Sequence, residues 1–299
     1  MKYDVAIIGA GISGMTLAIY LKRAAINFVL IEGKKPGGQI NFASSVENFP
    51  GYIKISGREI SQKVFEQVKA LDVSYINDEV ISVNKDDDSY ILKMKNSSDV
   101  VANTLFIATG KKIKKLDIPH ANDFLGIGLS YCATCDGMFF KDKDVLVVGD
   151  TNKALEESIY LSNICKKVIV LSENDEVRAD SFYREKVSMV DNIEILYNSK
   201  LQELIKDDVL KEAIIIRGGQ EERIFIDGCF AYVGYIPNSD LFSHLVDVNG
   251  DGYIIVDKNK QTSCKDIYAV GDVTDTKVYQ LVTAMGDAAI AANSFIEKN

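Results

Sequence analysis

The N-terminal pattern of apolar and polar positions predicts a strand, a turn, a helix and a second strand. A short apolar run over residues 4–8 is followed by three glycines and by a stretch of helical spacing, residues 15–23, that contains no helix breaker. A second apolar run, residues 27–31, ends at Glu32. Apolar runs of this length are typical of strands that are buried on both faces of a parallel sheet.

The glycines of this segment have the spacing of a dinucleotide-binding fingerprint. Gly9 suits the tight turn, Gly11 lets the backbone approach a pyrophosphate, and Gly14 allows the helix to pack closely on the strand. The N-terminus of the helix supplies N–H groups for the phosphates. Glu32 is placed to accept hydrogen bonds from ribose hydroxyls. Because all parts occur in the required order, we predict that this segment binds a dinucleotide.

The same pattern recurs 140 residues later without a gap. In this alignment Gly9 matches Gly149. The strand that ends at Ile31 matches one that ends at Leu171. The chain is therefore predicted to contain two βαβ nucleotide-binding domains of one design, which places it in the α/β class.

The second copy departs from the fingerprint at three positions. Thr151 replaces the second glycine, Ala154 replaces the third, and Ser172 replaces the acid. Alanine is tolerated at the third position, but the branched side chain of threonine occupies space that a pyrophosphate needs. We therefore expect the second copy to bind a nucleotide weakly.

The residues after Ser172 bear on which coenzyme the second copy could bind. A site for NADP uses arginine to pair with the 2′-phosphate, and each charged hydrogen bond contributes ~1.5–3 kcal/mol. Here Glu173, Asp175 and Glu176 place negative charge near that position, and Arg178 is the nearby cation. We expect NADPH to bind poorly. NADH is less firmly excluded, because Glu173 could reach a ribose hydroxyl.

Between the two copies lies a C-x-x-C pair, Cys132 and Cys135. In a cytosolic chain this spacing near βαβ units indicates a redox-active disulfide, because the thiolate of one cysteine can attack a mixed disulfide formed at the other. Such motifs also lower a thiol pKa from about 8.5 to about 7 or below. Asp136 follows directly and is placed to carry a proton to a departing thiolate.

A zinc site and a purely structural disulfide are the alternative interpretations of this pair. Zinc needs two more ligands, and the two histidines, His120 and His244, have no ligand-like spacing. The other cysteines, Cys165, Cys229 and Cys264, stand alone, so the sequence indicates no disulfide framework. We favour redox chemistry without a metal.

Composition narrows the range of partners. The 299 residues, 47% hydrophobic and 26% charged, are typical of a globular chain of roughly two domains. A net charge of −9 argues against nucleic acid and anionic membrane surfaces, because both would repel the protein. The longest apolar runs are too short to span a bilayer, and no basic segment precedes the first of them, so we expect a cytoplasmic enzyme.

Taken together, the motifs of the chain resemble those of low-molecular-weight thioredoxin reductases. In chain order they are GAGISG (9–14), GGQI (37–40), VENFPGY (46–52), IATG (107–110), CATCDG (132–137), GDVTD (271–275) and QLVTAMGDAAIAA (280–292). The resemblance covers nearly the whole chain. It implies two Rossmann-like domains of the three-layer ββα type, the second inserted into the first. The FAD-binding domain would comprise residues 1–113 and 240–299, and the redox domain residues 114–239.

The resemblance also implies roles for single residues and for partners. In this family the second cysteine, here Cys135, faces the flavin, whereas the first, Cys132, attacks the disulfide of thioredoxin. Asp136 is the acid–base residue, and the protein is a homodimer. The residues implied in binding FAD are Gly9, Gly11, Gly14, Glu32, Gly38, Gln39, Asn48, Val80, Gly271, Asp272, Gln280 and Leu281.

The departures in the second copy resemble a subgroup of the family that takes electrons from ferredoxin. Typical members carry a glycine-rich loop where GDTNKA (149–154) stands and an arginine-rich segment where LSENDE (171–176) stands. We therefore predict a ferredoxin-dependent thioredoxin reductase, since a flavin accepts electrons singly and delivers them in pairs. The alternatives are an NAD(P)H-dependent thioredoxin reductase, an oxygen-using dithiol oxidase, and a flavin-dependent redox sensor that changes state once without turnover.

Because ferredoxins are acidic, such a donor needs a basic docking surface. Lysines at 111–115 and 141–143, with Lys166 and Lys167, are candidates for it. The alternative interpretation, that these lysines are simply solvated on exposed segments, is the favoured one.

Overall fold

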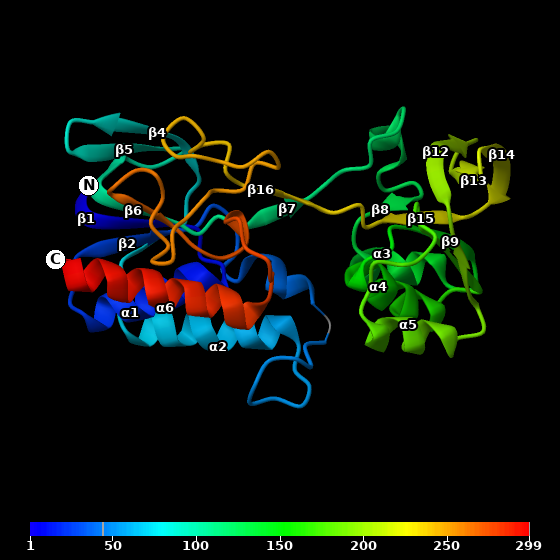
Figure 1. Ribbon diagram of the computed structural model, residues 1–299, viewed down its shortest axis with the longest axis horizontal. Helices are drawn as coiled ribbons and strands as arrows, with labels where there is room; N and C mark the ends of the chain where they lie inside the picture. Colours follow the sequence, from blue (N-terminus) through cyan, green and yellow to red (C-terminus); the bar gives the residue numbers. More distant parts are fainter. Residues whose placement is uncertain (44, 299) are drawn as a thin grey trace. The chain divides into compact units, whose positions relative to one another are not determined.

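A computed structural model of the protein describes residues 1–43 and 45–298, and the chain divides into two compact units (Figure 1). Unit 1 comprises Met1–Lys112 and Ile236–Asn299, and unit 2 comprises Ile113–Tyr235. Each unit contains a parallel sheet of Rossmann-like topology, and unit 2 is inserted into unit 1, which confirms the predicted fold class. The predicted boundaries, after residues 113 and 239, lie near these crossings, and what each unit binds stays a prediction.

Unit 1 is organised around the sheet β3-β2-β1-β6-β5-β4, and β17 also pairs with β6. The parallel strands are β1 (Lys2–Ile8), β2 (Phe28–Ile31), β3 (Tyr75–Ile76), β6 (Val100–Ile107) and β17 (Ile267–Ala269). The antiparallel strands are β4 (Val80–Asp86) and β5 (Ser89–Met94). The helices α1 (Ile12–Arg23), α2 (Gly57–Ala70) and α6 (Leu281–Lys298) lie together on one side of the sheet (Figure 1).

The side chains of β1 show why its apolar run is continuous. Val5 and Ile7 lie in the core that the strands share with α1 and α6. Ala6 and Ile8 lie in the core on the opposite face, which is formed with β4, β5 and the C-terminal segment. Since consecutive side chains of a strand point to opposite faces and both faces are covered here, every position from Val5 to Ile8 is apolar.

The C-terminal segment completes unit 1. β17 pairs with β6, the short 3₁₀ helix η4 (Gly271–Val273) follows it, and α6 packs against α1. The α6 face that packs there is built from small residues, since Ala284, Ala288, Ala291 and Ala292 are buried. Within residues 1–43 and 45–298, no helix has the length and apolar character that crossing a bilayer requires.

Unit 2 repeats this design around the parallel sheet β11-β10-β9-β15-β8. Its strands are β8 (Leu129–Ser130), β9 (Asp144–Val148), β10 (Lys167–Leu171), β11 (Ile193–Leu196) and β15 (Gly228–Ala231). The helices α3 (Ala133–Asp136), α4 (Asn152–Ser162) and α5 (Ser181–Ser188) lie on one side of it (Figure 1). The antiparallel sheet of β12 (Ser199–Lys206), β13 (Leu210–Arg217) and β14 (Gln220–Phe225) packs on the other face. The chain passes between the units through the paired strands β7 (Lys111–Ile113) and β16 (Tyr235–Pro237).

The internal repeat is visible in the backbone as well as in the sequence. β1 pairs with β2 in the register in which β9 pairs with β10, shifted by 140 residues. The N–H of Gly9 donates to the carbonyl oxygen of Ile31 at 2.8 Å. The N–H of Gly149 donates to the carbonyl oxygen of Leu171 at 3.2 Å. The two turns that precede α1 and α4 are therefore held in the same way.

We predict that Gly14→Ala destabilises the protein, because a Cβ at this position would collide with the carbonyl oxygen of Gly9. Overpacking of this kind costs ~1–3 kcal/mol. Gly11→Ala is the matched control, since no heavy atom of the described residues lies within 4 Å of a Cβ placed there. Thermal unfolding of the apoproteins, followed by circular dichroism, should give a lower Tm for Gly14→Ala alone. Equal melting temperatures would contradict this packing argument.

Candidate active site

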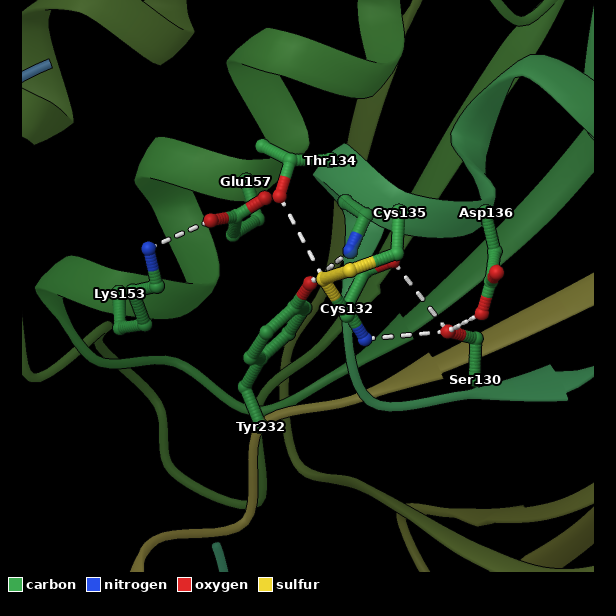
Figure 2. The surroundings of a disulfide bond; sticks show 9 residues. Ser130, Cys132, Thr134, Cys135, Asp136, Lys153, Glu157 and Tyr232 are labelled. Carbon is green, nitrogen blue, oxygen red and sulfur yellow. Dashed lines mark hydrogen bonds and ion pairs between the residues drawn. A yellow bond between two sulfur atoms is a disulfide. The ribbon is translucent and has the colours of Figure 1, made fainter. Parts of the chain in front are cut away.

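Cys132 and Cys135 form a disulfide in unit 2, with 2.07 Å between the sulfur atoms and 5.3 Å between the Cα atoms (Figure 2). β8 ends at Ser130, and the single turn of α3 begins directly after Cys132. The N–H groups of Cys135 and Asp136 donate to the carbonyl oxygen of Cys132 at 3.2 and 3.1 Å. Cys135 is exposed and Cys132 is half-buried, so a reaction partner can reach the disulfide.

Ser130 connects this disulfide to Asp136. Its hydroxyl donates to Oδ2 of Asp136 at 2.6 Å and accepts a hydrogen bond from the N–H of Cys132 at 3.0 Å (Figure 2). Ser130 is buried and Asp136 is half-buried, so the bridge is partly shielded from solvent. The carboxylate that the sequence suggested as a proton carrier is thus oriented by a serine that the sequence analysis did not single out. The signal available for it was a polar residue two positions before the first cysteine.

Tyr232 supports the opposite side of the redox turn. Its hydroxyl accepts a hydrogen bond from the N–H of Ala133 at 3.0 Å (Figure 2). Burial, and then the negative charge of Glu157, raise the pKa of Tyr232, so the phenol stays protonated at neutral pH. The hydroxyl of Thr134 lies 3.4 Å from Sγ of Cys132. No sequence signal indicated Tyr232, which directly follows β15, 100 positions from the first cysteine.

Glu157 is a buried carboxylate on α4 near the redox turn (Figure 2). Its Oε1 lies 2.5 Å from Nζ of Lys153, one helical turn earlier. Burial raises the pKa of Glu157, and the ammonium group of Lys153 opposes this effect. Within the described part of the chain, Oε2 of Glu157 has no hydrogen-bond partner. The carboxylate is therefore held by a single cation.

The remaining cysteines lie apart from this chemistry. Burial raises the pKa of Cys229 to about 12, and burial together with the charge of Asp142 raises the pKa of Cys165 to about 11. Both residues stay thiols at neutral pH. Cys264 is half-buried, and its sulfur lies 3.1 Å from the hydroxyl of Tyr90. No cluster of three or more potential metal ligands occurs within residues 1–43 and 45–298.

In unit 1 the glycine turn forms an open cradle. Gly11 caps α1, and apart from its neighbours along the chain no heavy atom of the described residues lies within 4 Å of a Cβ built on it, so the backbone is accessible to a phosphate. Gly9 has a φ of 103°, which favours glycine. The carboxylate of Glu32 accepts hydrogen bonds from the N–H of Ala10 at 2.7 Å and from that of Lys34 at 2.9 Å. These residues fit the pyrophosphate and ribose of a dinucleotide.

Other residues of the implied FAD set surround this cradle. A Cβ on Gly38 would lie 3.6 Å from Cα of Gly11, and one on Gly271 would lie 2.7 Å from Oγ of Ser13 in α1. Gly9, Glu32 and Gly271 all follow the carboxyl ends of parallel strands, where ligands of such sheets bind. The structure therefore brings these residues to one edge of the sheet.

The rest of the implied set lies in the loops of unit 1 and at the start of α6. The side-chain amide of Asn48 donates to Oε1 of Gln280 at 2.9 Å, and Leu281 begins α6. Val80 is buried at the start of β4. The side-chain amide of Gln39 donates to the carbonyl oxygen of Lys111 at 3.3 Å. Cys132, Cys135 and Asp136 belong to unit 2.

Lys111 lies in this region, although its run of lysines predicted an exposed position. As a candidate docking lysine it would be exposed, but its side chain is only 10% exposed. Nζ lies 3.1 Å from Oδ2 of Asp272 and 3.7 Å from the centre of the Tyr279 ring. Burial lowers the pKa of Lys111, and Asp272 opposes this effect. Lys111 therefore belongs to the surroundings of Asp272.

In unit 2 the corresponding loop, residues 149–151 before α4, forms a second cradle in which the side chain of Asp150 binds other side chains of the protein. Asp150 directly follows Gly149 and is only 2% exposed. Its carboxylate accepts hydrogen bonds from the hydroxyl of Ser172 at 3.0 Å and from the amide of Asn174 at 2.7 Å. Arg178 adds a hydrogen bond from Nε at 3.0 Å and an ion pair from Nη2 at 2.9 Å. Ser172 and Arg178 stand out in the sequence as departures from a coenzyme site, but the anion that binds them does not.

This network keeps Asp150 ionised. Burial alone would raise the pKa of Asp150, but hydrogen bonds from Arg178, Asn174 and Ser172 outweigh burial and hold the pKa below its usual value. The groups that could receive a coenzyme ribose or 2′-phosphate at the end of β10 are therefore already bonded to a carboxylate. A carboxylate directly after a turn glycine was the sequence signal for this arrangement.

Comparisons with known proteins show to which family the chain belongs. Residues 3–288 match the family described as pyridine nucleotide-disulphide oxidoreductase. The thioredoxin reductase of Bacillus subtilis (strain 168) is 36% identical over 298 residues, which cover 98% of this chain and 93% of that protein. The crystal structure of Lactococcus lactis thioredoxin reductase, 33% identical, superimposes with a TM-score of 0.95 and covers 100% of both chains. The chain belongs to the low-molecular-weight thioredoxin reductase family.

Membership of the thioredoxin reductase family makes the protein a disulfide oxidoreductase and implies a flavin cofactor. It confirms the family that the motifs indicated. A further relative, the thioredoxin reductase of Peptoclostridium acidaminophilum, is 33% identical over 309 residues, covering 99% of this chain and 98% of that protein. The ferredoxin-dependent subgroup stays a prediction.

We predict that iodoacetamide at about pH 8 labels Cys132 and Cys135 only after reduction, since the thiolate is the reactive form. Cys165 and Cys229 should stay unlabelled in both states, because they are buried and their pKa values are raised to about 11 and about 12. Peptide mass spectrometry gives the readout. Labelling in denaturant, where all cysteines react, is the control, and rapid labelling of Cys229 in the folded protein would contradict the prediction.

Proposed function

We propose that the protein is an FAD-dependent thioredoxin reductase that receives its electrons from ferredoxin rather than from a pyridine nucleotide. The observation that supports this choice of donor is the hydrogen-bond network in unit 2. There the carboxylate of Asp150 already accepts hydrogen bonds from Ser172, Asn174 and Arg178, the groups that could bind a coenzyme. Thr151 and Ala154, in place of two glycines of the fingerprint, support the same conclusion.

Unit 1 is the proposed FAD domain. When bound, FAD takes electrons singly and releases them in pairs, which couples a one-electron donor to a two-electron disulfide. The open space at Gly11 admits the pyrophosphate, and the anchored carboxylate of Glu32 has lone pairs left for ribose hydroxyls. The complete proposed set is Gly9, Gly11, Gly14, Glu32, Gly38, Gln39, Asn48, Val80, Gly271, Asp272, Gln280 and Leu281.

Unit 2 carries the proposed thiol chemistry. Two electrons and two protons convert the disulfide of Cys132 and Cys135 into two thiols. The thiolate of Cys132 attacks one sulfur of the partner disulfide, which forms a mixed disulfide and releases one partner thiolate. Cys135 then attacks Sγ of Cys132, re-forming the internal disulfide and releasing the second partner thiolate. Asp136, oriented by Ser130, supplies and receives the protons.

The surface beside the disulfide supports a protein as the substrate. Met138 and Phe139, in the 3₁₀ helix η3 (Gly137–Phe140) that continues from α3, are 63% and 74% exposed. Aromatic and methionine side chains are enriched in protein interfaces, and large apolar groups next to a reactive pair suit a partner with an apolar rim around its own disulfide. Thioredoxin is the proposed partner, because relatives of this length carry that activity in their names.

Charge gives only partial support for docking of an acidic donor. The candidate lysines Lys114, Lys115, Lys141 and Lys143 are exposed. Others lie against carboxylates, in the pairs Lys112–Asp240, Lys166–Asp144 and Lys167–Glu194. We propose that ferredoxin docks by means of the exposed lysines, and that the protein is a homodimer, the latter by family resemblance alone.

The donor is tested by anaerobic mixing of the oxidised flavoprotein with reduced ferredoxin, with NADPH and with NADH, while the flavin absorbance is followed. The proposal predicts rapid bleaching by ferredoxin and no comparable bleaching by either nicotinamide. Rapid bleaching by NADPH or NADH would overturn it in favour of a nicotinamide-dependent reductase. Steady oxygen consumption driven by dithiols would instead indicate a dithiol oxidase.

The roles of the two cysteines are tested by single substitutions. In reduced Cys135→Ser, the remaining thiol of Cys132 should form a stable mixed disulfide with oxidised thioredoxin, because no second thiol can resolve it. Cys132→Ser is the matched control and should trap much less. Non-reducing electrophoresis and mass spectrometry give the yields. Since Cys135 is the more exposed residue, preferential trapping by Cys132→Ser would reverse the assignment.

A further inference from the structure

We infer that Asp150 is the residue that excludes pyridine nucleotides from unit 2, acting as a built-in anion in the place of a coenzyme phosphate. The inference rests on the proposed function and deepens it, because it assigns the loss of the coenzyme to one side chain. It concerns specificity, since Asp150 has no part in the thiol chemistry of Cys132 and Cys135.

The position of Asp150 is the first argument. It lies between Gly149, which directly follows β9, and Thr151, which caps α4. A coenzyme pyrophosphate approaches such a turn because the N-terminus of the following helix presents N–H groups and a positive dipole. A buried and ionised carboxylate at this point repels an incoming phosphate.

The internal repeat provides the second argument. Asp150 stands where the first copy has Ala10, and Ser172 stands where it has Glu32. In unit 1 the loop is tied to the strand by a hydrogen bond from the N–H of Ala10 to Glu32. In unit 2 the hydroxyl of Ser172 donates to Asp150 instead. The acidic residue is at the strand end in unit 1 and in the loop before the helix in unit 2. A hydrogen bond therefore connects loop and strand in both units, but in unit 2 a carboxylate lies in the loop.

The donors around Asp150 give the third argument. Ser172, Asn174 and Arg178 come from the end of β10 and the loop after it, where a nucleotide-binding domain recognises the ribose and its 2′-phosphate. Arg178 is 69% exposed, so its guanidinium group lies within reach of a ligand, but two of its nitrogens are committed to Asp150. Removing the carboxylate leaves these donors available to a 2′-phosphate.

The test is the binding of NADP⁺ and NAD⁺ to the oxidised FAD-loaded protein, measured by isothermal titration calorimetry. The wild type should bind neither at low millimolar concentration. Asp150→Ala should bind NADP⁺ at least about tenfold more tightly than the wild type, which corresponds to one charged hydrogen bond gained. The gain for NAD⁺ should be smaller, because it has no 2′-phosphate for Arg178. Asp150→Asn, which removes the charge but keeps the shape, should gain less than Asp150→Ala.

Two controls separate this exclusion from a general charge effect. Asp175→Ala removes an exposed carboxylate nearby without releasing any donor to Asp150, so it should gain little. Adding Arg178→Ala to Asp150→Ala should abolish the preference for NADP⁺. Continued protection of the buried Cys165 and Cys229 from iodoacetamide shows that each variant keeps its fold.

The outcomes distinguish this inference from the proposed function. Folded Asp150→Ala and Asp150→Asn with wild-type affinity for NADP⁺ would overturn the inference and leave the proposed donor standing. An equal gain in Asp175→Ala would also overturn it, in favour of a general charge effect. Tight binding of NADP⁺ by the wild type, with bleaching by NADPH, would overturn both.

Discussion

The hydrogen bonds that Asp150 accepts inside unit 2 are the constraint on which this account depends. The two units share a strand register, a turn glycine and the helix after it, but the first copy leaves open space beside Gly11 while the second places a buried carboxylate in its loop. An ionised group enclosed by Ser172, Asn174 and Arg178 is costly to uncover, because a buried carboxylate without partners is strongly unfavourable. We therefore propose that the two cradles differ in dinucleotide binding for an electrostatic reason.

The loop between β9 and α4 in unit 2 has the same backbone shape as its counterpart in unit 1, and the redox turn depends on residues that contact this loop. The N–H of Tyr232 donates to the carbonyl oxygen of Val148 at 2.8 Å, and the backbone of Tyr232 leaves no room for a Cβ on Gly149. Its hydroxyl accepts the hydrogen bond from Ala133, within the turn that carries the disulfide. Tyr232 thus contacts both the loop after β9 and the turn that carries the cysteine pair, so a change that displaced Tyr232 would disturb both.

The fold could be predicted from the sequence, and the networks within it could not. The apolar run at 4–8 and its copy indicated parallel strands because both faces of each sheet are covered. The partners of Asp150 lie 22–28 residues away from it, and a list of charges does not show which are paired. Ser130 and Tyr232 act through hydrogen bonds of individual residues, which leave no periodic signal in the sequence. Lys111 was expected on an exposed segment, as a candidate docking lysine or a solvated one, because its neighbours are lysines, but its side chain is 10% exposed and pairs with Asp272.

The central claim is tested most directly by a crystal structure of the FAD-loaded protein grown in the presence of NADPH. The account predicts flavin density along the turn at Gly11 in unit 1. In unit 2 it predicts that Asp150 still bonds Arg178 and that no coenzyme is present. A coenzyme phosphate bound to Arg178, with the carboxylate of Asp150 displaced from the loop, would contradict the account.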